Sequence, residues 1–249
     1  MAEGYRRPWF GPLGELAWHS SLALYEMAVL GRHPWWWRLH RSLARHFRGL
    51  DPEGLARAAQ GPAPESLAYG ETPAVSLGRI LTVSGLGPGA RLVDLGSGRG
   101  LAVCTACCLG WQAVGLEYFE EYVRRARRVA ADLGVEAEFV AGDFLSAPLP
   151  QGDLFYAAST AFGQATRARL GRRLAEELPP GTLLATLDWV LEPPAFEGLA
   201  RFYIPVTWGV ACVGLYRRAG LSPGCRREGG PDHSTVRSTG ASRSSRSGL

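Results

Sequence analysis

The residues best suited to chemistry in this chain form a run in which one acid is followed by three glycines at every second position, LVDLGSGRG (92–100). A short apolar stretch precedes Asp94, and a helix-like segment begins at Leu101. Glycine tolerates positive φ and lets a ligand approach the backbone. A strand that turns into a helix here aims N–H groups at the crevice above the sheet, with the Asp94 carboxylate at its mouth. The run therefore predicts a site for a nucleotide-like ligand.

Two kinds of ligand compete for this loop. The dinucleotide fingerprint is G-x-G-x-x-G, but the third glycine comes one residue early here, and Leu101 takes the fingerprint position. Asp94 also suits a cationic group better than a phosphate. S-adenosylmethionine (SAM) carries an ammonium, a carboxylate and a sulfonium, and no phosphate. We therefore predict SAM as the cofactor, with a dinucleotide or a purely structural turn as the alternatives. The predicted cofactor contacts in the loop are Asp94, Gly96, Ser97, Gly98 and Gly100.

Two more acids follow at informative positions. The stretch 112–116 reads as a second strand that ends at Glu117, which lies 17 residues after Gly100. In Rossmann-like units an acid about 20 residues past the glycines binds ribose hydroxyls. The stretch 137–141 reads as a third strand and leads to Asp143 and Phe144, which we expect to contact the adenine amine and to cover the ring. The alternative for Asp143 alone is a turn residue.

Alternating strand and helix patterns predict an α/β, Rossmann-like sheet. Thr72 and Pro73 read as an N-cap and first helical residue of a helix that runs to about Ser84. The further expected elements are a helix over 120–133, strands over 154–157 and 182–187, a helix over 164–178 and an antiparallel hairpin over 202–218. We expect three parts: an N-terminal helical extension (1–68), a catalytic domain (69–220) and a tail (221–249).

The N-terminal extension reads as two helices, over 13–30 and 34–48, followed by a linker at 61–64. The first is too short and too polar for a membrane span, and no signal-peptide pattern precedes it. The second presents apolar residues on one face and arginines on another. Either it packs on the catalytic domain with a solvated basic face, or it binds an anionic partner. Three consecutive tryptophans, Trp35 to Trp37, cannot all point inward, so at least one should be partly exposed.

Composition narrows the compartment and the partners. The formal net charge is +4, and all 27 basic side chains are arginine, which indicates a GC-rich genome rather than nucleic-acid binding. Cys104, Cys107 and Cys108 share a helix face but lack a fourth ligand, so we expect no metal site. Free thiols are typical of a reducing, cytoplasmic compartment.

The tail is rich in Ser, Gly and Arg and should be disordered. Its five arginines against Glu228 and Asp232 give a net charge of +3, so it is either inert or a weak, salt-dependent nucleic-acid contact.

With these motifs in place, the chain resembles the class I SAM-dependent methyltransferases. It more narrowly resembles the disruptor-of-telomeric-silencing family of histone lysine methyltransferases, which lack a SET domain. The matching motifs, in order, are YGET (69–72), VDLGSGRG (93–100), GDFLS (142–146), AFG (161–163) and VTW (206–208). Lysine methyltransferases of the ATP synthase c-subunit have a similar layout. The resemblance implies a seven-stranded sheet, mostly parallel with an antiparallel last strand.

By this resemblance Tyr69, Glu71 and Thr72 would lie at the methionine part of SAM, and Asp94, Glu117 and Asp143 would keep the roles given above. The family's paired asparagines are replaced by Ala158 and Ser159, followed by Thr160, and its channel tyrosine aligns with Leu215, next to Tyr216. The candidate residues on the acceptor side are Ser159, Thr160, Phe162, Trp208 and Tyr216. The aromatic members would line a channel that favours a neutral lysine, and the hydroxyls would accept a hydrogen bond from it.

Three functions stay open at this point. The first is methyl transfer from SAM to an amine, most naturally a lysine of a protein partner. The second is methyl transfer to a small molecule or a nucleic acid from the same cofactor site. The third is a non-catalytic SAM-binding module. The residues after the fourth strand are not the Asn/Asp-Pro-Pro-aromatic motif of many nucleic-acid amino-methyltransferases.

Overall fold

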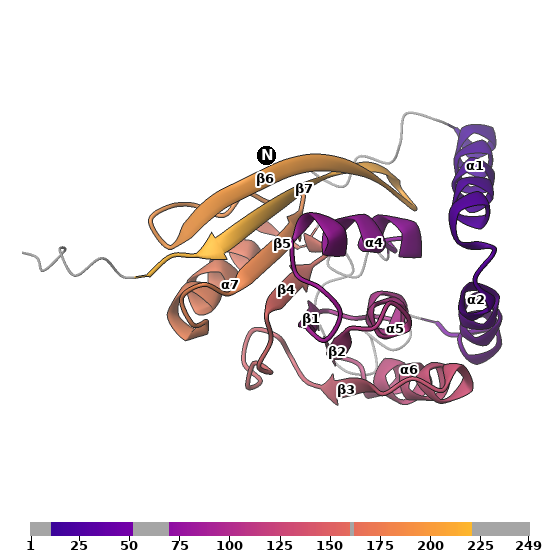
Figure 1. Ribbon diagram of the computed structural model, residues 1–249, viewed down its shortest axis with the longest axis horizontal. Coiled ribbons are helices and arrows are strands. Elements are labelled where there is room, and N and C mark those ends of the chain that lie inside the picture. Colours follow the sequence, from indigo (N-terminus) through magenta and orange to yellow (C-terminus); the bar gives the residue numbers. More distant parts are fainter. Residues whose placement is uncertain (1–10, 52–69, 160–161, 221–249) are drawn as a thin grey trace, which may run out of the picture.

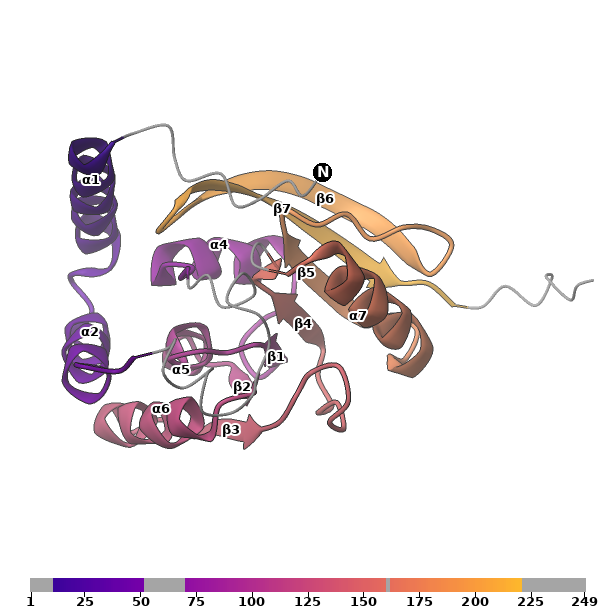
Figure 2. The same cartoon turned by 180° about the vertical axis from the view of Figure 1, so that it is seen from behind.

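A computed structural model describes residues 11–51, 70–159 and 162–220 of the chain. Its centre is one seven-stranded sheet with helices on both faces, and two N-terminal helices stand at one side (Figures 1 and 2). The tail, the 61–64 linker, Tyr69, Thr160 and Cys225 lie outside the described residues.

The strands are arranged in the order β3-β2-β1-β4-β5-β7-β6. Their bounds are β1 Arg91–Leu95, β2 Gln112–Glu117, β3 Ala137–Ala141, β4 Leu154–Ala157, β5 Leu183–Leu187, β6 Phe196–Val206 and β7 Gly209–Arg218. Strands β1 to β5 pair in parallel, and β7 is antiparallel to both β5 and β6, so β7 alone runs against the other six. The strand order reverses between β1 and β4, where such sheets bind their ligands above the carboxyl ends of the strands. The predicted fold class is confirmed.

The two faces of the sheet are covered unequally (Figure 1). Helices α4 (Ala74–Val83), α5 (Leu101–Cys108) and α6 (Glu120–Leu133) cover one face, and α7 (Gln164–Glu177) covers the other. One apolar cluster joins α4, α5 and α6 to inward residues such as Leu92, Ala113 and Leu154. A smaller cluster joins Leu170 and Leu174 of α7 to the opposite face. The alternation of these side chains along each strand follows from the two-residue period of a β-strand.

Most predicted elements have the observed bounds within a few residues, and two differ. The helix expected after Thr72 begins at Ala74, with Pro73 in the preceding position. Thr72 therefore makes no N-cap hydrogen bond, and its hydroxyl bonds the phenol of Tyr156 instead. The hairpin also begins earlier than predicted, at Phe196, because β6 pairs with β7 along nearly its whole length.

The N-terminal extension forms α1 (Pro12–Leu30) and α2 (Pro34–His46). Helix α1 is joined to the turn between β6 and β7, where Trp18 donates to the Val206 carbonyl at 2.9 Å. Helix α2 packs on α6, with Leu39 and Leu43 in the core. Of the three tryptophans Trp36 is buried and Trp37 is 47% exposed, as predicted for at least one of them. No helix in the described part of the chain is long and apolar enough to cross a membrane.

Candidate functional site

The glycine loop connects β1 to α5 at the point where the strand order reverses. Gly100 has φ +79°, and a Cβ there would lie 2.7 Å from the Phe139 ring and 3.0 Å from Ala126, so only glycine fits. Ser97 is buried with its hydroxyl against Gly115, facing β2. The loop is thus held tightly between β1, β2 and α6.

The amides of this loop are used inside the protein. Gly96 and Ser97 donate to the Leu116 carbonyl at 2.8 and 3.2 Å, and Gly100 donates to the Ser97 carbonyl at 2.8 Å. Gly98 donates to Glu117 at 2.8 Å. The loop therefore does not present these four N–H groups to a ligand as a pyrophosphate cradle would, which corrects our expectation for the backbone and argues against a dinucleotide.

Asp94 lies at the end of β1, where burial perturbs its carboxyl group. Its side chain is only 3% exposed. It accepts no hydrogen bond from the described residues, and its register partner on β4 is Tyr156. Burial raises the pKa of Asp94 to about 8, and the nearby Glu117 carboxylate adds to the effect. A buried carboxylate without a donor is stabilised by a cationic partner, so this position fits the ammonium group of SAM.

Glu117 ends β2 and faces the same loop. One of its oxygens accepts the Gly98 N–H at 2.8 Å and the other accepts the Phe119 N–H at 3.0 Å. Burial raises the pKa of Glu117, and these backbone donors oppose the rise. Each carboxylate oxygen can accept a second hydrogen bond, so the group retains capacity for ribose hydroxyls.

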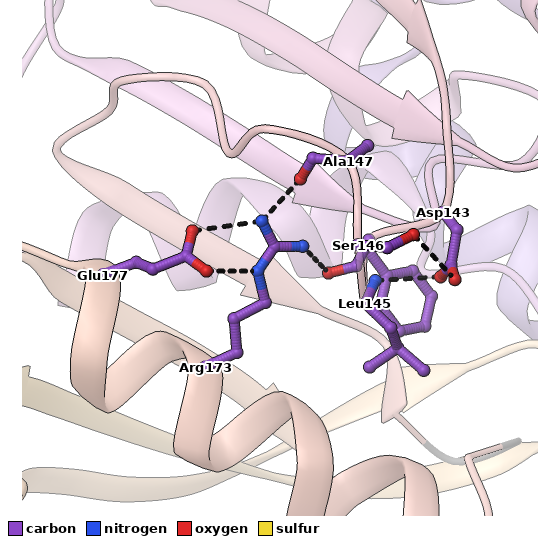
Figure 3. Close-up of polar contacts among 7 residues, drawn as sticks. Asp143, Leu145, Ser146, Ala147, Arg173 and Glu177 are labelled. Carbon is purple, nitrogen blue, oxygen red and sulfur yellow. Dashed lines mark hydrogen bonds and ion pairs between the residues drawn. The ribbon is translucent and has the colours of Figure 1, made fainter.

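The turn after β3 places Asp143 and Phe144. The Asp143 carboxylate accepts the Leu145 N–H at 2.8 Å and the Ser146 hydroxyl at 3.3 Å (Figure 3). Phe144 packs on Phe162, with ring centroids 4.9 Å apart. A Cβ on Gly96 would lie 3.8 Å from Phe144 and 3.9 Å from Phe162. The aromatic pair therefore borders the first glycine of the loop.

The segment 70–72 approaches the loop from the N-terminal side of α4. Arg99, within the glycine loop, pairs with Glu71 through two donors, with Nε to Oε1 at 2.8 Å. The Glu71 N–H also donates to the Thr207 hydroxyl at 2.9 Å, and the Thr207 N–H donates to the Glu71 carbonyl at 3.1 Å. These contacts connect the cofactor loop to the turn of the β6–β7 hairpin.

The acceptor-side candidates do not all gather at this place. Phe162 borders Gly96, and Trp208 packs on Gly70, where a Cβ would lie 2.1 Å from its ring. Ser159 is fully buried and donates its hydroxyl to the Leu187 carbonyl at 2.6 Å. Tyr216 lies in the apolar cluster on the α7 face, with its ring over Gly214.

Sequence reasoning missed three contributors to this site: Arg99, Tyr156 and Thr207. Each acts through a partner far along the chain, such as the 28 positions between Glu71 and Arg99. The spacing of residues in the local sequence does not predict such a pair. The only available signal was the charge of Arg99 inside a glycine loop, next to a separate acidic motif.

The described residues contain no group of three or more His, Cys, Asp and Glu side chains that could hold a metal ion. The thiols of α5 are free. Burial raises the pKa of Cys107 and of Cys108 to about 11, and raises that of Cys104 further still.

Comparisons with known proteins indicate a methyltransferase domain. Residues 93–186 match the family model described as a methyltransferase domain. Acetylserotonin O-methyltransferase of Mus musculus is 30% identical over 198 residues, which is 71% of this chain and 51% of that protein. The chain thus spans about half the length of this curated relative.

Two solved structures share the fold. One is an RNA methyltransferase from Salinibacter ruber in complex with S-adenosyl-L-homocysteine, with 25% identity and a TM-score of 0.53 over 62% of this chain and 97% of that chain. The other is TrmN from Thermus thermophilus, with 21% identity and a TM-score of 0.53 over 62% of this chain and 52% of that chain.

Proposed function

We propose that this chain, whose residues 93–186 form a class I methyltransferase domain with SAM as its cofactor, transfers a methyl group to an amine nitrogen, in the first instance a protein lysine. The observation that carries the cofactor assignment is the burial of the Asp94 carboxyl group, which is 3% exposed at the end of β1 near Glu117. A buried carboxylate is stabilised by a cationic amino group, and the amides of the adjoining glycine loop already donate hydrogen bonds within the protein.

The residues of the chain have distinct tasks in this proposal. Asp94 binds the amino end of the cofactor, Glu117 the ribose, and Asp143 and Phe144 the adenine. Thr72 and Tyr156 hold each other at the inner wall. Bound SAM supplies the electrophilic methyl group on its sulfonium. The protein has only to align a neutral nucleophile in line with it, for which positioning is the main source of rate.

The nitrogen acceptor is favoured by the apolar walls of the site. Phe162 borders the cofactor loop at Gly96, and Trp208 lies over Gly70. Exclusion of water by such a wall disfavours a charged ammonium and lowers its pKa, so that the lone pair becomes available. Lysine is the member of this class to which the YGET and GDFLS motifs point.

A small-molecule acceptor is the second candidate, and it is favoured by the 30% identity to an acetylserotonin O-methyltransferase. The alignment with that protein extends over 198 residues, which is 71% of this chain. An oxygen acceptor would need a base in reach of the hydroxyl, since an alcohol is a weak nucleophile until its proton is removed.

The test is to incubate the purified full chain and its Asp94→Asn variant with methyl-labelled SAM and a lysate of the host. Label in protein that is recovered as methyl-lysine and is lost in the variant supports the proposal. Label in the small-molecule or RNA fraction overturns the lysine acceptor. SAM binding without label in any fraction overturns catalysis and leaves a binding module.

A further inference from the structure

One arginine of α7 holds the turn that carries Asp143 and Phe144, whose apolar side chains pack on the same face of the sheet as α7. Arg173 of α7 donates from one terminal nitrogen to the Phe144 carbonyl at 2.7 Å and from the other to the Ala147 carbonyl at 2.5 Å (Figure 3). The two acceptors lie at the middle and the end of the turn. A planar guanidinium that bonds both fixes their orientation relative to α7.

The arginine is itself held rigidly. Glu177, one helical turn along α7, accepts from Arg173 at 2.7 and 3.0 Å. The Arg173 side chain is only 11% exposed, so the charge is largely removed from water. Hydrogen bonds from a charged donor are stronger than neutral ones, and exclusion of water strengthens them further. Glu177 therefore keeps the guanidinium aimed at the two carbonyls.

The contact of Arg173 extends to the glycine loop through Phe144. Its carbonyl bonds Arg173, while its ring packs on Phe162 and borders Gly96 of the glycine loop. The Asp143 carboxylate is set by bonds inside the same turn, to Leu145 and Ser146. The internal bonds fix the shape of the turn, and Arg173 fixes its place over the site.

We propose that Arg173 is a positioning residue for the adenosine part of SAM, acting through the backbone of the 143–147 turn without touching the cofactor. The proposal rests on the assignment of Asp143 and Phe144 to adenine, and it does not depend on the methyl acceptor. A turn that is free to shift by about an ångström would present the carboxylate and the ring out of register with the base.

The molecule offers a matched structural control. Arg218 of β7 also donates to main-chain carbonyls, to Ala175 at 2.8 Å and Ala195 at 3.4 Å, and is also buried. It joins α7 to the hairpin and makes no hydrogen bond to the 143–147 turn in the described part of the chain. Arg172, the exposed neighbour of Arg173, serves as a charge control.

The experiment measures equilibrium binding of S-adenosylhomocysteine and of methylthioadenosine, which lacks the amino-acid part, to the full chain and its variants. We expect Arg173→Gln to weaken both ligands by about tenfold and Arg173→Lys by about threefold, since lysine cannot span two carbonyls. Arg218→Gln should lower the melting temperature about as much as Arg173→Gln does, and should leave both affinities within about twofold of the parent. Arg172→Gln should change neither the affinities by more than about twofold nor the melting temperature.

Equal affinity in Arg173→Gln and Arg172→Gln overturns the proposal. So does a loss in Arg218→Gln as large as that in Arg173→Gln, because the effect would then follow stability. If Arg173→Gln does not fold, the lysine variant decides, with intermediate affinity expected and unchanged affinity contradicting the proposal. Because no acceptor is present, these results are independent of the lysine assignment.

Discussion

The cofactor half and the acceptor half of this site use their polar groups in opposite ways. In the cofactor half the Asp94 carboxylate is buried without a described donor, and Glu117 accepts one backbone N–H on each oxygen. In the acceptor half Ser159 donates to the Leu187 carbonyl and Thr186 donates to the Trp189 carbonyl, both at 2.6 Å. The first half keeps the Asp94 and Glu117 carboxylates available for a ligand, whereas the second uses its hydroxyls to hold loops together.

The acceptor loops are also braced from α7. Arg167 donates to the carbonyls of Ser159 and Asp188, both at 2.9 Å, and so joins the ends of β4 and β5. In our proposal, specificity for the acceptor comes from shape and aromatic surface rather than from these hydroxyls.

The strongest test of the cofactor half is Asp94→Asn, which removes the charge and keeps the shape. We expect SAM affinity to fall about 30- to 100-fold, the range for a charged hydrogen-bond partner. The pKa of the folded-state carboxyl group lies above its usual value, so its contribution lowers the stability of the ligand-free fold as pH rises from about 4 to 8. The variant should therefore be more stable than the parent at pH 8.

Calorimetric binding and urea titration measure the two effects. Asp153→Asn is the control, because Asp153 accepts the Arg91 N–H at the opposite end of the strands. Unchanged SAM affinity in Asp94→Asn would remove this carboxylate from the cofactor site.

Gly100→Ala tests how tightly the cofactor loop is packed. The new methyl group would meet the Phe139 ring at 2.7 Å on a backbone with φ +79°. We expect the free energy of unfolding to fall by about 2–4 kcal/mol, from strain and overpacking together. Gly134→Ala has φ +69° but open space around its Cβ, so it should lose only about 1–2 kcal/mol. Equal losses in urea titrations would show that packing at Gly100 contributes nothing.

Ser159→Ala addresses the acceptor half. Since its hydroxyl is donated to Leu187, we expect a loss of about 1 kcal/mol in unfolding free energy. The rate constant kcat should stay within about threefold once the acceptor is known. A drop of about 100-fold in kcat at unchanged stability would restore the acceptor role predicted from the sequence.

The last test concerns the thiols of α5, which lie outside both halves of the site. With a pKa of about 11, Cys107 and Cys108 should react with iodoacetamide at pH 7.5 about 100-fold more slowly than thiols with the ordinary value of 9.0. Mass spectrometry of the native and the urea-unfolded chain gives the ratio. Rapid labelling of the native chain would show that these thiols are not held neutral by burial.

The sequence predicted the cofactor half of the site in more detail than the acceptor half. The loop 94–100, Glu117 and Asp143 each follow a strand in the local sequence, and parallel strands bring their carboxyl ends to one edge. The spacing therefore predicted that these residues lie close together, and Glu117 does accept the Gly98 N–H and lie near Asp94. That they bind SAM stays a prediction. The hydrogen bonds of the cofactor half could not be read in this way, because the Arg99–Glu71 and Arg173–Phe144 contacts join segments that only the folded chain brings together.

The acceptor half depends on exact placement after β4 and β5, which sequence spacing does not fix. Neighbouring residues of a strand point to opposite faces of the sheet, as Leu215 and Tyr216 do here. An alignment error of one position therefore assigns a side chain to the wrong face. The hydroxyl of Ser159 could not be assigned either, because its partner at Leu187 is 28 positions away. Long-range partners, rather than residue types, decide which polar groups remain available.

The pairing of Asp94 with the amino group of SAM is tested most directly by the number of protons released when SAM binds. At pH 6.5 the Asp94 carboxyl group is protonated in the ligand-free protein, since its pKa is about 8, while the amino group of SAM is charged. Titration calorimetry in buffers of different ionisation enthalpy should show close to one proton released per SAM bound, and none for Asp94→Asn. Binding without proton release in the parent chain would contradict the pairing of Asp94 with the cofactor.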